Sequence, residues 1–174
     1  YRRSLIQKSG ARFVDLAEIG SYEDGFFNLE VFGKADRVVY LAAYLYHYRR
    51  DGSSSVTSGY NPRLYDQWQT LYDRMEAIIR SNQLGSEYEA ALNNRIALGI
   101  LGLGLNITVS TQSMGKKVKD IHRIIRQERY RKAYKNLPLN YFPIHWKLFY
   151  GCARHGFAFG VYVLLTVIQR IISR

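Results

Sequence analysis

The sequence predicts an α+β fold that is mainly helical by residue count, in which a small mixed sheet precedes four or five helices. In residues 1–57, short β-branched and aromatic runs alternate with helical stretches. From Pro62 onward, apolar residues recur at the three- and four-residue spacing of a helix face. Hydrophobic residues make up 47% of the 174, so a packed core is expected and a wholly disordered chain is excluded.

The first part, residues 1–58, combines helices with strands. Gly10 and Gly33 stand where helices stop, and the run from Tyr22 to Gly25 stands where one begins. The polar, Gly-containing run after Tyr48 is typical of a loop. In chain order we expect a helix over 2–9, a strand over 12–15, a helix from about 22 to 33, strands over 37–41 and 44–48, and a loop over 49–55.

The second part, residues 59–174, is predicted to be helical. The expected helices cover 62–82, 87–109, 116–135 and 144–172, the last of them bent or broken near Gly151, Gly156 or Gly160. The longest uncharged apolar run, 156–168, has 13 residues. That is short of the roughly 20 that cross a bilayer, and the run 97–109 is equally short, so we predict core helices. A helix that lies on a membrane surface is the alternative.

The excess positive charge lies entirely in the second half. Residues 1–90 hold 11 Lys/Arg and 12 Asp/Glu, whereas residues 91–174 hold 14 and two, which gives the second half a charge of +12. Such a one-sided basic surface suits nucleic acid or an anionic membrane. The single cysteine, Cys152, excludes an internal disulfide and indicates a reducing compartment. The chain opens on Tyr1 without a signal-peptide pattern, so we expect a fragment.

Two groups of side chains are candidates for chemistry. Glu23 and Asp24 stand directly before an apolar helical stretch, where the helix amides favour a carboxylate. Acids in a first turn are also routine, so a purely structural role is the alternative. Arg49 and Arg50, with Ser54 in the loop that follows, could clasp a phosphate. The alternative for these three is a solvated hairpin end.

Five short segments of the first 57 residues occur in a specific order. They are Tyr1-Arg2-Arg3-Ser4-Leu5-Ile6, Gly10-Ala11-Arg12-Phe13, Tyr22-Glu23-Asp24-Gly25-Phe26-Phe27-Asn28-Leu29, Ala35-Asp36-Arg37-Val38-Val39-Tyr40, and the run from Tyr44 to Ser55. The ordered set resembles the second half of the catalytic domain of a bacterial family 2 glycosyltransferase. The resemblance covers about a third of the chain, and the helical part that follows matches only in kind.

The resemblance implies a truncated GT-A type, Rossmann-like domain that uses a nucleotide-diphosphate sugar. It implies that residues 1–58 are the acceptor-side part of that domain and that 59–174 form a C-terminal helical region. Asp24 would be the general base, with Glu23 beside it to place the acceptor, and Arg49, Arg50 and Ser54 would face the diphosphate. The complete enzyme would use Mg or Mn, but no Asp-X-Asp metal motif occurs here. We therefore expect this fragment to bind no metal and to be inactive.

The family's activity further implies inverting transfer to a cell-surface polysaccharide or lipid-linked acceptor. We expect a cytoplasmic protein, peripheral at the inner face of the membrane, where Trp146, Phe157, Phe159 or Tyr162 would dip into the interface. The main alternative is a basic helical module that binds nucleic acid or lies against a membrane without catalysis. The first third has no nucleic-acid-binding motif, so we expect no nucleic-acid partner. Association into a homo-oligomer is left open.

Overall fold

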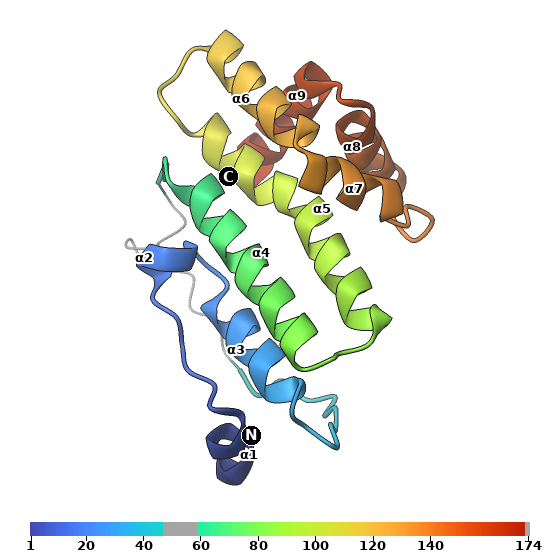
Figure 1. Cartoon of the computed structure of the whole chain (residues 1–174). Helices are drawn as coiled ribbons and strands as arrows, with labels where there is room; N and C mark the ends of the chain where they lie inside the picture. The colour runs from blue at the N-terminus through green and yellow to red at the C-terminus, as the bar shows by residue number, and fades with distance from the viewer. Residues whose placement is uncertain (47–58, 173–174) are drawn as a thin grey trace. The chain divides into compact units, whose positions relative to one another are not determined.

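The structure, a computed structural model, describes residues 1–46 and 59–172. Within these residues every regular element is an α-helix, and Figure 1 shows the helices in chain order. The chain forms two compact units. Unit 1 comprises Tyr1–Gly59 and Asp66–Leu84, and unit 2 comprises Tyr60–Tyr65 and Gly85–Arg174. The boundary predicted at residue 58 divides the chain by function, and it stays a prediction.

Unit 1 contains α1 (Arg3–Ser9), α2 (Leu16–Ile19), α3 (Glu23–Phe32) and most of α4 (Leu64–Ser81). The helices expected at 2–9, 22–33 and 62–82 are thereby confirmed. α1 ends at Gly10, whose φ of 69° is a left-handed conformation that glycine adopts without steric cost. A small apolar core joins α1 to α3, made by Ala11, Phe27 and Val31 with Leu5 and Ile6 packed against it.

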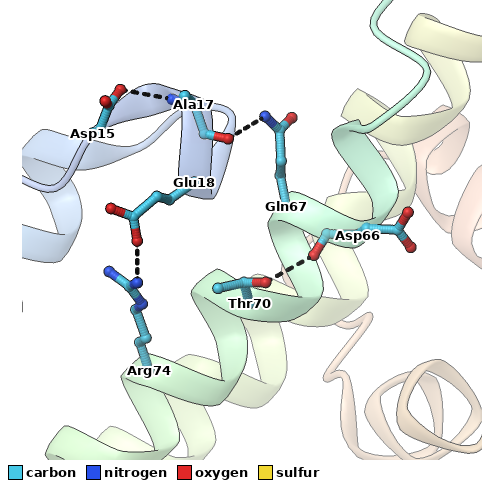
Figure 2. Close-up of polar contacts among 7 residues, drawn as sticks. All are labelled: Asp15, Ala17, Glu18, Asp66, Gln67, Thr70 and Arg74. Atoms are coloured by element: carbon cyan, nitrogen blue, oxygen red, sulfur yellow. Dashed lines mark hydrogen bonds and ion pairs between the residues drawn. The ribbon is translucent and has the colours of Figure 1, made fainter.

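Polar contacts fasten α2 to α4 (Figure 2). Asp15 caps α2 by accepting a hydrogen bond from the Ala17 amide at 2.8 Å. Gln67 of α4 is buried and donates from Nε2 to the Ala17 carbonyl at 3.0 Å. Arg74, two turns further along α4, forms an ion pair with Glu18. α4 therefore fixes the position of the segment that leads into α3.

The prediction of a small mixed sheet in the first part is wrong. No strand occurs among residues 1–46 and 59–172, so the described chain is helical and is not the α+β, Rossmann-like GT-A arrangement. A strand needs a partner for its backbone groups, and residues 37–46 have no regular secondary structure and are all exposed. Val39 is 67% exposed and Tyr40 is 89% exposed. The segment 12–15, also expected to be a strand, instead leads into the N-terminal cap of α2. Of the strand expected over 44–48, residues 47–48 lie outside the described residues.

Unit 2 contains α5 (Ser86–Thr108), α6 (Met114–Arg126), α7 (Glu128–Asn136), α8 (Ile144–His155) and α9 (Ala158–Ile172). α5, the longest helix of the unit, contacts α6, α7 and α9. Gly104 is the point of close approach, since a Cβ there would run into a methyl group of the buried Leu165 on α9. The helix expected over 87–109 is confirmed, and so is the break near Gly156, which adopts a φ of 76° between α8 and α9.

The prediction of a single helix over 116–135 is wrong, because this segment forms two helices. Gln127 has extended backbone with ψ near 142°, and it separates α6 from α7. α6 buries Ile121, Ile124 and Ile125. A straight continuation would carry Lys132, one repeat of two turns after Ile125, into the core. The break lets Tyr130, Ala133 and Tyr134 face inward instead.

One helix of the described residues, α5, is long and apolar enough to cross a membrane by length and composition. That is weak support for a span, because the core helix of a soluble protein meets the same criterion. In this structure 44% of the apolar stretch of α5 is buried within the protein.

Candidate functional site

Glu23 and Asp24 are the first two residues of α3, as the sequence predicts. Their position depends on α4, because Trp68 Nε1 of α4 donates to Ser21 Oγ at 3.1 Å, just before α3 begins. Behind the acids, Phe26 and Phe27 are buried. The helix start is thus held on one side by a core and on the other by a tryptophan hydrogen bond, which leaves the first turn at the surface.

Tyr22, directly before the acids, has an unusual backbone. Its φ of 74° is left-handed, which costs a non-glycine residue about 1–2 kcal/mol. The Tyr22 ring lies across the helix start on Gly25, and a Cβ on Gly25 would collide with that ring. Glycine is therefore the residue that permits this ring position. Sequence reasoning missed Tyr22, although a glycine placed inside the first turn of a helix was a usable signal.

Asp24 has the geometry of an accessible carboxylate. Its side chain is exposed, and Oδ1 accepts a hydrogen bond from the Gly25 amide at 2.6 Å. The exposed amides of a helix N-terminus attract negative charge. One carboxylate oxygen is thus oriented by the backbone while the group stays open to a substrate. Glu23 beside it is half-buried.

Glu30, two turns after Glu23 on α3, is a half-buried acid that sequence reasoning did not single out. Burial raises the pKa of Glu30 above its ordinary value of 4.5, although a backbone hydrogen bond from Arg12 acts in the opposite direction. Its Oε2 atom is buried and has no hydrogen-bond partner among the described residues. A heptad spacing from Glu23 places the two acids on one side of α3, and that spacing was the only signal in the sequence.

The remaining predicted site residues are not placed by the structure. Arg49, Arg50 and Ser54 lie outside the described residues. Their proximity to Asp24 therefore stays a prediction. Among residues 1–46 and 59–172, no group of three or more His, Cys, Asp or Glu side chains could hold a metal ion.

Two proteins of Bacillus subtilis (strain 168) are similar to this chain. One is named "Putative glycosyltransferase EpsH" and is 33% identical over 98 residues, which are 56% of this chain and 28% of that protein. The other is named "Uncharacterized glycosyltransferase EpsJ" and is 30% identical over 152 residues, which are 87% of this chain and 42% of that protein. These relatives support a glycosyltransferase.

The chain spans less than half the length of either relative. No family model matches it. No solved structure matches it either. The similarity to EpsJ extends through most of the chain and therefore includes helices of unit 2 as well as the segment with Glu23 and Asp24. The helical region thus shares the relationship to a glycosyltransferase with the first part.

Proposed function

We propose that this chain is part of a bacterial family 2 glycosyltransferase. The complete enzyme transfers a sugar, with inversion, from a nucleotide-diphosphate donor to a cell-surface polysaccharide or a lipid-linked acceptor. The observation that carries the proposal is the likeness to two glycosyltransferases together with an exposed, backbone-oriented carboxylate at Asp24. The 1–58 part would serve the acceptor, and 59–174 would be a C-terminal helical region.

Asp24 acts as the general base in this proposal. Its carboxylate takes the proton of an acceptor hydroxyl, whose oxygen attacks the anomeric carbon from the face opposite the diphosphate. The bond from that carbon to the diphosphate oxygen breaks, and the diphosphate leaves with the electron pair. The exposed Asp24 carboxylate suits this step because it needs only to reach the acceptor. Glu23 and the Tyr22 ring would shape the acceptor position around it.

Arg49, Arg50 and Ser54 are proposed to face the leaving diphosphate and offset its charge. A divalent Mg or Mn ion is proposed for the complete enzyme only. The described residues offer no fitting ligand group, so no step above uses a metal.

We further propose that the 174 residues alone neither bind a nucleotide-diphosphate sugar nor transfer one. Micromolar binding of a uridine or guanosine diphosphate sugar to the isolated chain would refute this.

The test of the proposal is Asp24→Asn in the complete enzyme. Asparagine keeps an oxygen that can accept from the Gly25 amide, so α3 should form normally. Loss of a general base should lower kcat by about 10²–10⁴ while the donor dissociation constant stays nearly unchanged. Asp36→Asn, at an exposed acid outside the helices, is the matched control. Turnover of Asp24→Asn within a few-fold of wild type would sink the assignment.

We also propose that the protein works in the cytoplasm, peripherally attached to the anionic inner face of the membrane. The support is the charge of unit 2, which holds 15 Lys/Arg against four Asp/Glu. Each basic residue close to an anionic surface contributes on the order of 1 kcal/mol of attraction. Attachment of this kind weakens as added salt screens the charges. Binding to vesicles with anionic lipid, released by salt, is the expected result.

A further inference from the structure

The last helix of unit 2 is apolar on two opposite faces. α9 buries Ala158, Val161 and Leu165 against the rest of the unit. On the opposite side, apolar side chains recur every fourth residue and are exposed by 43–69%: Phe159, Val163, Val167 and Ile171. We call these four residues the α9 stripe. Phe157, which is 56% exposed, extends it at the N-terminal end through a ring contact with Phe159.

A helix that is apolar all round is normally covered on all sides. α9 packs on α5, α6 and α8, whereas the stripe on its opposite side is exposed. The stripe continues for three turns of helix, so it is longer than the scattered single exposed apolar residues of an ordinary surface. It therefore needs an occupant.

The charges around the stripe identify what kind of occupant fits. From Arg129 to Arg174 the sequence has eight Lys/Arg and no Asp or Glu. At one end of the stripe, the Arg126 guanidinium lies against Gly156, where a Cβ would come within 2.7 Å of Nε. At the other end, Arg170 is exposed beside Ile171. An apolar strip with a cation at each end, in a unit whose last 46 residues hold no acid, matches an anionic lipid interface, in which acyl chains meet negative headgroups.

We propose that the α9 stripe is the part of the protein that enters the membrane interface. α9 lies parallel to an anionic bilayer with the stripe turned into the headgroup–acyl boundary, while Arg126 and Arg170 contact lipid phosphates. The inference rests on the proposed peripheral attachment and names the surface responsible for it. It is independent of the sugar-transfer step. Sequence reasoning named Phe157 and Phe159 but not Val163, Val167 or Ile171.

The experiment measures sedimentation of the whole 174-residue chain with vesicles of phosphatidylcholine, with and without phosphatidylglycerol. The test variant carries Phe159→Gln, Val163→Gln and Val167→Gln. Glutamine has a higher helix propensity than Phe or Val, so α9 should remain folded, and the net charge is unchanged. The matched control replaces three exposed apolar residues of unit 1 in the same way: Val38→Gln, Val39→Gln and Leu41→Gln. Circular dichroism checks the helix content of both variants.

We expect wild type and the unit 1 variant to bind anionic vesicles equally and the α9 variant to bind at least tenfold more weakly. Unchanged binding of the α9 variant would overturn the stripe as the inserting surface, yet leave attachment by charge intact. Absence of binding by wild type to either vesicle would overturn both the inference and the proposed attachment. A wild-type dimer that the α9 substitutions turn into a monomer would assign the stripe to a second copy and overturn the inference. Salt-sensitive binding to duplex DNA without vesicle binding would do the same.

Discussion

Unit 1 and unit 2 differ most clearly in charge. Unit 1 has ten Lys/Arg and ten Asp/Glu, whereas unit 2 has 15 and four. In unit 1, fully buried apolar residues such as Leu71 act together with the polar contacts of α4 at Gln67 and Arg74. Unit 2 packs five helices through fully buried apolar residues such as Ile100, Leu103 and Leu165.

The proposed catalytic carboxylate and the proposed membrane attachment therefore fall in different units. Asp24, the proposed general base, lies in the neutral unit, at a helix start that a hydrogen bond from α4 holds in place. The proposed attachment to an anionic surface belongs to the other unit, in which α9 packs on α5, α6 and α8 and exposes its other face. Each of the following changes tests one side of this comparison.

The largest expected effect concerns the close packing of unit 2. Leu165 is fully buried and touches α5 where Gly104 lacks a side chain. Leu165→Ala should lower the free energy of unfolding by about 2–5 kcal/mol through lost burial and a cavity. Gly104→Ala should cost about 1–3 kcal/mol from overpacking, partly offset by about 1 kcal/mol of helix propensity. Urea denaturation followed by circular dichroism measures both.

The double variant sharpens this prediction. In Gly104→Ala with Leu165→Ala, the new methyl group occupies part of the space that the leucine leaves. The loss of stability should therefore be smaller than the sum of the two single losses. Additive losses would show that α5 and α9 do not meet at these two residues in solution.

Prediction from sequence succeeded where periodicity decides the structure and failed where a distant partner decides it. The face of α4 with Trp68, Leu71 and Met75 follows from spacing alone and is buried as expected. The run 37–41 has β-type residues, but a strand forms only with a partner, which propensity does not supply. Gln127 interrupts a pattern that looks continuous because cations and apolar residues alternate on both sides of it.

The candidate site, too, could be predicted from the sequence only where local patterns determine it. The position of Glu23 and Asp24 at a helix start could be predicted from the local pattern. The ring of Tyr22 on Gly25 and the buried oxygen of Glu30 could not, because both depend on backbone conformation and on packing between segments. Short-range signals thus located the acids, and three-dimensional contacts determined their surroundings.

A medium effect is expected for the polar attachment of α2 in unit 1. Gln67→Met keeps the side-chain volume but removes the Nε2 donor to the Ala17 carbonyl (Figure 2). We expect a loss of about 1 kcal/mol, the usual net value of one hydrogen bond. Thr70→Val is the control, because its hydroxyl donates to the Asp66 carbonyl of the same helix at 3.2 Å and does not join α2 to α4. Equal losses for the two variants in thermal denaturation would contradict the idea that Gln67 fastens α2.

The smallest expected effect is a pH dependence from Glu30. Burial raises its pKa in the folded protein above the ordinary value of 4.5, so the folded state holds this proton more tightly than the unfolded state does. The resulting contribution to stability is complete below pH 4.5 and is lost as the pH rises through the folded pKa. Glu30→Gln cannot lose a proton, so the stability of the variant relative to wild type should increase by a small amount between pH 4 and pH 7. Urea denaturation of both proteins in a Trp146→Phe background, followed by the fluorescence of Trp68 in unit 1, measures this difference in stability. A constant difference across this pH range would mean that Glu30 is solvated in solution, and a difference that falls as the pH rises would mean that a nearby cation stabilises its carboxylate.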